Sequence, residues 1–195
     1  MATKTPRRLI VGISGASGVV YGIRMLELLK RSDIETHLVM SKSAEMTMAY
    51  ETDAKPKDVR ALASVYHPIA DVGASISSGS FPTMGMVIVP CSIRTMSEIA
   101  TGVTSSLLSR AADVVLKEHR RLVLAVRETP LHGGHLRTMT TLADIGAIVA
   151  PIVPAFYNRP QTVDDIINHT VGRLLDLFGI ETDVVKRWQG GPTDE

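Results

Sequence analysis

The stretch RLIVGISGASGVVYGIR, residues 8–24, decides the fold class that this sequence predicts. Its apolar run 9–11 suits a strand buried on both faces. Small and hydroxylated residues follow at 14–18, where the backbone can turn sharply and bring its N–H groups close to an anion or a polar ring. Helical spacing of apolar residues begins at Val19, which places a helix N-terminus at this turn. Because GISGASG is not GxGxxG, both a nucleotide-like ligand and an ordinary strand-to-helix turn are consistent with it.

The same alternation of strand and helix continues along the chain. Further strands are predicted at 35–40, 86–89, 122–126 and 147–150, with helices between them, a loop over 66–80 and a last long helix at 163–178. This order predicts βαβ units and a parallel sheet with helices on both faces. We therefore expect one single-domain Rossmann-like (flavodoxin-like) α/β fold over residues 1–195, with flexible ends at about 1–7 and 190–195.

Composition narrows the class of protein. The 21 basic and 20 acidic side chains give a formal net charge of +1, which does not favour nucleic acid or an anionic membrane as a partner. The single cysteine rules out an internal disulfide framework and suits a reducing cytosol. The longest apolar stretches, such as 147–156, are shorter than the about 20 residues that span a bilayer. We expect a cytoplasmic protein with no secretion signal and no membrane anchor.

Open parallel sheets bind ligands beyond the carboxyl ends of their strands. The segments that follow the predicted strands there are 14–17, 41–42, 91–95 and 127–128. Three of them are serine-bearing turns that open helices, and the fourth pairs a cation with a carboxylate. Such a set suits a phosphorylated, aromatic, hydrogen-bonding ligand such as flavin mononucleotide (FMN).

Eight segments extend over nearly the whole chain: GISGASG, ETHLVMSK, ISSGSF, GMVIVPCSIRT, RAADVVLKE, VRETPLH, PAFYNRPQ and RWQG, in that order. Together they resemble the UbiX-like flavin prenyltransferases. The family belongs to a wider group of flavoproteins that also contains cysteine-peptide decarboxylases. The resemblance implies FMN binding by Gly15, Ala16, Ser17, Ser41, Ser92, Ile93, Arg94, Thr95 and Arg127.

The resemblance also implies a second substrate, dimethylallyl monophosphate. Its phosphate is expected to be held by Lys117, Arg127, Tyr157 and Arg173. Ser17, Glu51, Glu128 and Lys117 match catalytic positions, and Arg110 and Trp188 match possible pocket positions. The family pattern completes each pocket across subunit contacts in a homo-dodecamer.

The implied reaction attaches the dimethylallyl group to N5 of reduced FMN, expels phosphate and closes a ring onto C6. Cationic side chains would stabilise the leaving phosphate. Because one phosphate leaves and no aspartate-rich motif is present, we expect no metal. Ser17 is expected to hydrogen-bond near N5, whereas either Glu128 or the released phosphate would accept the proton during ring closure. The prenylated flavin would then serve a separate UbiD-type decarboxylase, in quinone synthesis or in the breakdown of phenolic acids.

Structural interpretations compete with these roles. Arg110, Asp113 and Lys117 have the spacing of an ion-pair ladder on a helix, and that spacing alone favours the ladder. Cys91 is expected to be a small core residue, and two histidines, His132 and His135, make a poor metal site without a third ligand. Tyr157 and Trp188 could be packing residues, and Arg127 and Glu128 could bind only neighbouring side chains.

Two other functions remain open from the sequence. One is a flavin-dependent decarboxylase that acts directly on an aromatic or cysteine-derived acid. The other is an FMN carrier without catalytic activity, in which loss of the phosphate-binding cations would leave FMN binding intact.

Overall fold

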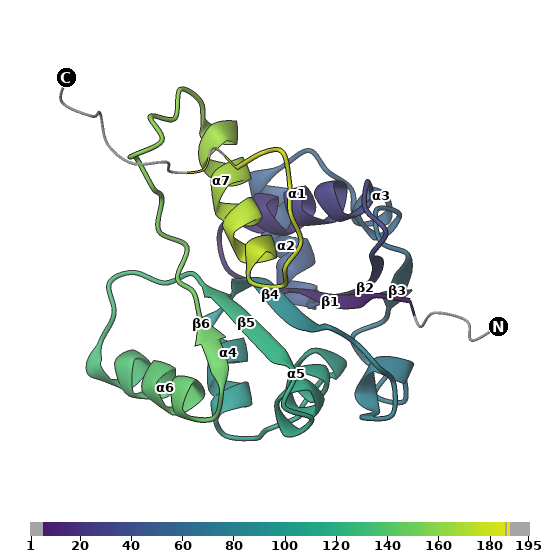
Figure 1. Cartoon of the computed structure of the whole chain (residues 1–195). Coiled ribbons are helices and arrows are strands. Elements are labelled where there is room, and N and C mark those ends of the chain that lie inside the picture. Colours follow the sequence, from purple (N-terminus) through teal and green to yellow (C-terminus); the bar gives the residue numbers. More distant parts are fainter. Residues whose placement is uncertain (1–5, 186, 188–195) are drawn as a thin grey trace.

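The computed structural model describes residues 6–185 and 187, which form one parallel sheet covered by helices (Figure 1). The sheet order is β3-β2-β1-β4-β5-β6. The strands are β1 Arg8–Ile13, β2 Glu35–Met40, β3 Val65–His67, β4 Gly85–Cys91, β5 Arg121–Val126 and β6 Ala147–Val149. In this order the chain runs outward from β1 in one direction and from β4 in the other, as in doubly wound folds. The predicted fold class is confirmed.

Seven α-helices and one 3-10 helix are present in this part of the chain. They are α1 Val19–Leu29, α2 Lys42–Glu51, α3 Pro56–Arg60, η1 Ser75–Ser77, α4 Ile93–Ala100, α5 Leu107–Lys117, α6 Gly133–Asp144 and α7 Val163–Asp176. Among the described residues, no helix is both long enough and apolar enough to cross a membrane. The predicted flexible ends, 1–7 and 190–195, fall mostly outside the described residues and stay a prediction.

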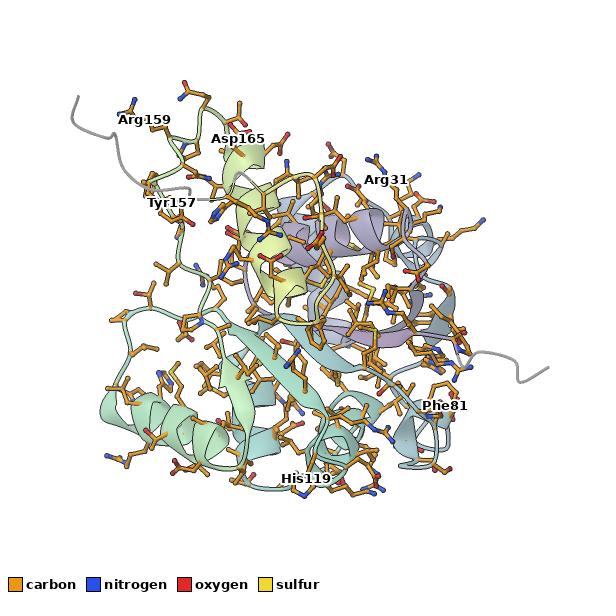
Figure 2. All side chains as sticks on the ribbon, in the orientation of Figure 1. Arg31, Phe81, His119, Tyr157, Arg159 and Asp165 are labelled. Atoms are coloured by element: carbon orange, nitrogen blue, oxygen red, sulfur yellow. The ribbon has the colours of Figure 1, made fainter. Side chains whose placement is uncertain are left out.

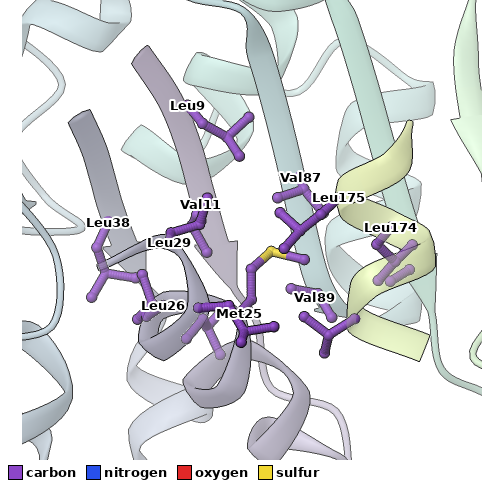
Figure 3. Packing of buried hydrophobic residues seen from close by; sticks show 14 of the residues in the cluster. Leu9, Val11, Met25, Leu26, Leu29, Leu38, Val87, Val89, Leu174 and Leu175 are labelled. Atoms are coloured by element: carbon purple, nitrogen blue, oxygen red, sulfur yellow. The ribbon is translucent and has the colours of Figure 1, made fainter. Parts of the chain in front are cut away.

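Strand residues alternate between two hydrophobic cores, one on each face of the sheet. Leu9, Val11 and Ile13 of β1 belong to the core that α1, α2 and α7 cover. Ile10 belongs to the opposite core, which α4, α5 and α6 cover. Figure 3 shows α1 and α7 packed beside each other over β1 and β4. The buried apolar runs noted in the sequence are therefore buried on both faces, as a parallel sheet requires.

Two glycines allow helices to approach the central strands closely. A Cβ atom at Gly12 of β1 would lie 2.7 Å from Cδ1 of Leu108 in α5, and one at Gly22 of α1 would lie 2.6 Å from the carbonyl oxygen of Val89 in β4. Gly22 needs glycine because the Val89 carbonyl belongs to the backbone, whereas a side chain at Gly12 would require the Leu108 methyl group to move. The two glycines hold α1 and α5 against the strands whose carboxyl ends form the candidate site.

The edge strand β3 overlaps the start of the segment 66–80 that the sequence predicts as a loop. A chain of polar side chains fixes it to the sheet: His67 Nε2 lies 2.9 Å from His37 Nδ1, and His37 Nε2 lies 2.9 Å from Glu35. Arg8 Nε also donates to Glu35, at 3.0 Å. Burial, followed by the neighbouring His37, lowers the pKa of His67. The loop prediction was wrong here because a strand of three residues is too short to show a periodic pattern.

Candidate functional site

Ser14 joins the carboxyl ends of β1 and β4. Its side chain is fully buried, and its Oγ donates to the Pro90 carbonyl at 2.9 Å and accepts from the Ser92 N–H at 2.7 Å. The Ser14 N–H also donates to the Pro90 carbonyl, at 3.2 Å. The strand order reverses between β1 and β4, which is where ligands bind in folds of this kind. Ser14 therefore fixes the two turns that border the expected crevice.

Glu51, at the end of α2, lies against the N-terminus of α1. Its Oε2 accepts hydrogen bonds from the N–H groups of Gly18 and Val19, at 2.9 and 3.1 Å. Gly18 has a φ of 96°, a left-handed conformation that favours glycine. The sequence predicts an anion or a polar ring at this helix terminus, and within the chain the anion is the carboxylate of Glu51.

The pKa of Glu51 lies below the ordinary value for a glutamate. Burial acts to raise it, but the Ser17 hydroxyl, the two N–H groups and the positive charge of Arg127 together lower it. Glu51 is therefore a carboxylate at neutral pH. Two of the predicted site residues, Ser17 and Arg127, therefore interact with a third, Glu51, at the carboxyl edge of the sheet.

A cavity of about 210 Å³ opens where α2 and α4 begin. It is lined by Ser41, Lys42, Ser43, Ile69, Ser92, Arg94, Thr95, Glu98, Ser105, Ser106 and Leu108. We call it the serine-rich cavity, because hydroxyl groups dominate its polar lining. Four of the residues predicted to bind FMN lie together here: Ser41, Ser92, Arg94 and Thr95.

The two helix N-termini give this cavity the character of an anion site. Ser41 caps α2 by accepting from the Ala44 N–H at 3.0 Å, and Ser92 caps α4 by accepting from the Thr95 N–H at 3.3 Å. The earlier N–H groups of a first turn have no intrahelical acceptor and carry the positive end of the helix dipole. Arg94 adds a cation whose side chain is 81% exposed and is paired at 3.0 Å with Glu98, a carboxylate of the same cavity. A phosphate is the ligand group that such donors bind best.

The turn 15–17 packs against the N-terminus of α2. A Cβ at Gly15 would lie 2.3 Å from Cβ of Ser43, which lines the serine-rich cavity. Ala16 and Ser17 are partly exposed, and the Ala16 N–H donates to the Ser14 carbonyl at 2.9 Å. The predicted flavin-binding residues Gly15, Ala16 and Ser17 therefore lie beside the cavity without lining it.

Arg127 and Glu128 follow β5 and are both exposed. The Arg127 N–H donates to the Cys91 carbonyl at 3.0 Å, which ties the end of β5 to the end of β4. Glu128 accepts a hydrogen bond from the Thr129 N–H at 3.0 Å. Arg127 contributes to the electrostatic environment of Glu51, whereas Glu128 is available at the surface of the crevice.

A second cavity, of about 330 Å³, brings Tyr157 and Arg173 together. We call it the tyrosine cavity; segment 150–157 and α7 form it, and no residue lines both cavities. Tyr157 Oη lies 3.1 Å from Nε2 of His169, and Arg173 is paired with Asp176 at 2.6 Å. Figure 2 shows Tyr157 on the segment that leads to α7. Two of the four residues predicted to hold the substrate phosphate therefore share one cavity.

Lys117 lies at the opposite edge of the sheet from Arg127. It ends α5, from which the chain enters β5 at Arg121, whereas Arg127 follows the other end of that strand. The six residues of β5 correspond to about 20 Å. Within one chain, Lys117 therefore does not join Arg127.

The expected ion-pair ladder on α5 is present only in its first half. Arg110 pairs with Asp113 at 2.7 Å, as the spacing predicts. Lys117 pairs instead with the next residue, Glu118, at 2.5 Å, so the ladder that spacing alone favours does not extend to Lys117, for which the resemblance implies a phosphate-binding role. The carboxylate that Lys117 contacts therefore belongs to the adjacent residue and not to Asp113, four residues earlier on the helix.

The remaining predicted residues have clear positions, with one exception. Cys91 is fully buried in the core, and burial raises its pKa to about 12, which confirms it as a core residue. His132 caps α6 through Nδ1, and its ring stacks on that of His135 at 3.6 Å. Within residues 6–185 and 187, no cluster of histidine, cysteine and acidic side chains is placed to hold a metal. Trp188 lies outside the described residues.

Five residues that contribute to the site are not among the predicted ligand-binding residues. Ser14 was seen only as part of a turn, whereas it bridges two strands. Ser43 and the pair 105–106 line the serine-rich cavity. His169 lines the tyrosine cavity although its helical spacing marks it only as a core position. Among these residues, only Ser14 has a signal in the sequence, because it directly follows a buried strand.

Comparison with known proteins relates this geometry to a family. The Flavoprotein family model matches residues 2–175. The flavin prenyltransferase UbiX of Escherichia coli K12 is 62% identical over 187 residues, which are 94% of this chain and 99% of that protein. A crystal structure of AnUbiX (PadA1) with FMN and dimethylallyl pyrophosphate superposes with a TM-score of 0.94 at 50% identity, over 96% of this chain and all of that one. A dodecameric FMN-dependent UbiX-like decarboxylase from E. coli O157:H7 gives 0.92, also at 50% identity, over 94% of this chain and all of that one. The chain therefore belongs to the Flavoprotein family and, within it, to the UbiX flavin prenyltransferases.

Proposed function

We infer that this protein is a flavin prenyltransferase, which joins the dimethylallyl group of dimethylallyl monophosphate to N5 and C6 of reduced FMN. One observation carries this conclusion: 96% of the chain superposes, at 50% sequence identity, on a relative whose structure is described as a complex with FMN and dimethylallyl pyrophosphate. The two cavities of this chain have the donors that two phosphate-bearing ligands need.

The serine-rich cavity fits the phosphate-bearing end of FMN. It combines two helix N-termini, several hydroxyl groups and one exposed guanidinium, which are donors for a phosphate and a polyol. We propose that Ser41, Ser92, Ile93, Arg94 and Thr95 hold this end of the molecule. Gly15, Ala16 and Ser17, which lie next to Ser43, would then face the flavin ring together with Arg127.

Reduced FMN supplies the nucleophilic N5 and C6 positions, and the protein orients them. Ser17 donates to the carboxylate of Glu51, which is itself fixed by two backbone N–H groups. This arrangement defines the position of the Ser17 hydroxyl beside the ring. We propose that Ser17 and Glu51 form one hydrogen-bonded unit that holds the N5 edge. Glu128, exposed in the crevice, is proposed to accept the proton during ring closure; the released phosphate is the competing base.

The cations expected to bind the substrate phosphate do not all lie at the same edge of the sheet in one chain. Breaking the allylic C–O bond leaves negative charge on the phosphate, which Arg127, Arg173 and Lys117 would stabilise. Because Lys117 lies at the opposite edge of the sheet from Arg127, we propose that Lys117 reaches the site from another copy of the chain. Arg110 is a further pocket candidate on the same helix, and Trp188 is a candidate outside the described residues.

Assembly into a homo-oligomer is therefore part of the proposed function. A relative is dodecameric, and this chain exposes large apolar side chains before and at the start of α7, with Val153 73%, Phe156 67% and Val163 71% exposed. Such side chains on a single chain suit burial between subunits. We propose a homo-dodecamer in the cytoplasm, whose prenylated flavin passes to a UbiD-type decarboxylase.

Anaerobic incubation of the purified protein with reduced FMN and dimethylallyl monophosphate tests the activity. We expect release of inorganic phosphate and a flavin with an altered absorption spectrum. The absence of both would overturn the proposal. Release of carbon dioxide from an aromatic or cysteine-derived acid by this protein alone would instead identify a decarboxylase.

Mixed oligomers test the role of Lys117 across subunits. Lys117→Ala and Arg127→Ala would each be inactive alone. Equal amounts of the two variants would be refolded together, so that they assemble at random. If a site takes Lys117 from one copy and Arg127 from another, about a quarter of the sites then contain both cations. We expect about that fraction of the wild-type rate. Complete inactivity of the mixture would place both cations on one chain, and full activity of Lys117→Ala alone would remove Lys117 from the reaction.

A further inference from the structure

His169 is a buried histidine that the mechanism above does not use. It lies in the middle of α7 with 5% of its surface exposed. Its Nε2 is 3.1 Å from Oη of Tyr157, and the two rings meet edge to face, with centroids 5.5 Å apart and planes at 82°. The contact joins a fixed helix to the segment that carries Tyr157 (Figure 2).

The same cavity contains a cation that suits a phosphate. Arg173 follows His169 by one helical turn, so the two side chains project from the same face of α7. Both line the tyrosine cavity with Tyr157. The side chain of Arg173 is 54% exposed, so its ion pair with Asp176 is one that a doubly charged ligand can compete for. A phosphate bound to Arg173 in this cavity would lie beside the Tyr157 phenol.

Counting donors fixes the direction of each hydrogen bond in such a complex. A phosphate dianion only accepts hydrogen bonds, and a phenol has one proton to donate. If the Tyr157 hydroxyl donates to the phosphate, its oxygen can only accept from His169. His169 must then carry its proton on Nε2.

The surroundings of His169 favour a neutral ring. Burial is the main cause that lowers its pKa, and the positive charge of Arg173 adds to it, while Asp176 opposes both. A neutral imidazole has one N–H, which the phosphate complex would place on Nε2. Hydrogen bonds in a series polarise one another, so donation to the phenol oxygen makes the phenol a better donor.

We propose that His169 is a positioning residue, whose Nε2–H donates to Tyr157 Oη and directs the phenol proton to the phosphate of the dimethylallyl substrate beside Arg173. This proposal rests on the proposed function and adds a residue to it. His169 touches neither the reacting carbon nor the flavin. It acts through Tyr157, and its contribution grows as negative charge develops on the leaving phosphate.

Two amides of different length test the donor directly. His169→Gln places an amide N–H near the position of Nε2, whereas His169→Asn carries the same group on a shorter side chain that does not reach Tyr157. With the assembled protein, reduced FMN and dimethylallyl monophosphate, we expect His169→Asn to lower kcat/KM for phosphate release about 5- to 10-fold, the worth of one hydrogen bond. His169→Gln should stay within about twofold of the wild type. Equal rates for the two variants would overturn the proposal.

A double-mutant cycle with Tyr157→Phe separates positioning from packing. Without the phenol hydroxyl, His169→Asn should change kcat/KM no further, because its whole effect passes through that group. An equal loss in both backgrounds would show that His169 acts through packing, and would refute the proposed role. His169→Leu is the alternative loss variant if His169→Asn does not fold, as judged by its melting temperature.

Binding of inorganic phosphate gives a measurement that does not depend on turnover. By isothermal titration calorimetry at constant pH, His169→Asn should bind phosphate more weakly than the wild type, and His169→Gln should bind it like the wild type. If the wild-type protein shows no prenyl transfer, the proposed function fails, while this comparison still decides the role of His169. Identical phosphate affinities of all three proteins would overturn the positioning role alone.

Discussion

Replacing Ser14 by alanine tests the link between the two turns that border the crevice. The substitution removes the Oγ that accepts from the Ser92 N–H at 2.7 Å and donates to the Pro90 carbonyl at 2.9 Å. The Pro90 carbonyl keeps the Ser14 N–H as a donor, at 3.2 Å. The main loss is therefore the acceptor of the Ser92 N–H.

The loss of the acceptor for the Ser92 N–H sets the size of the expected destabilisation. Leaving a buried donor without an acceptor costs about 1–3 kcal/mol. We take about 2 kcal/mol, because Ser92 is only partly buried. For a domain of this length, that corresponds to a fall in melting temperature of about 4–8 °C. Since Ser92 also lines the serine-rich cavity, FMN should bind more weakly.

Thermal unfolding followed by circular dichroism and FMN titration followed by flavin fluorescence measure the two effects. Ser75→Ala is the matched control, because Ser75 is exposed and lies on η1, away from both turns. We expect the control to melt and bind FMN like the wild type. A Ser14→Ala protein with an unchanged melting temperature and unchanged FMN affinity would refute the bridging role of Ser14.

Three further predictions concern residues of the same region. Gly15→Ala should lower both thermal stability and FMN affinity, because its Cβ would lie 2.3 Å from that of Ser43; Ser43→Gly should restore part of both, and no restoration would contradict the steric reason. Glu51→Gln should be less stable than the wild type at neutral pH. Because the pKa of Glu51 is lowered in the folded state, the wild type has this extra stability above the ordinary carboxyl pKa of about 4.5 and loses it as the pH falls through the lower folded pKa. A difference in melting temperature between the two proteins that persisted below that pH would argue against this. Cys91, buried and with a pKa raised to about 12, should react with iodoacetamide only after unfolding; rapid labelling of the native protein would contradict its place in the core.

The sequence predicts most of this fold because its central strands are apolar runs bounded by turns. β1, β2, β4 and β5 have almost entirely buried side chains, which produce a pattern visible without a structure. β3 has three residues at the sheet edge and is held by polar contacts between His37 and His67. Those contacts depend on the register of β2 and β3, so no local pattern could indicate them.

The candidate site likewise has features that the sequence predicts and features that depend on the packing of the helices. The serine turns of the first, second and fourth strands lie at the carboxyl edge as predicted, because parallel strands share that edge. The contact of Glu51 with the N-terminus of α1 joins residues 33 positions apart and depends on how α2 packs against α1. The separation of Lys117 from Arg127 follows from the direction of α5, which runs back to the amino edge. The resemblance implies one site for both residues, and their separation within one chain is the reason for the proposal that two copies contribute to it.

The carboxylate of Glu51 at the start of α1 also bears on which nucleotides this fold can select. A dinucleotide bound to a doubly wound sheet of this strand order places its pyrophosphate at the first βα turn, on the N-terminus of the following helix. Here that position already holds a negative charge, fixed by the N–H groups of Gly18 and Val19. A pyrophosphate would have to displace it against charge repulsion. We therefore expect this one acidic side chain to disfavour dinucleotides, whereas a mononucleotide with its phosphate at α2 and α4, as proposed above, would avoid the repulsion.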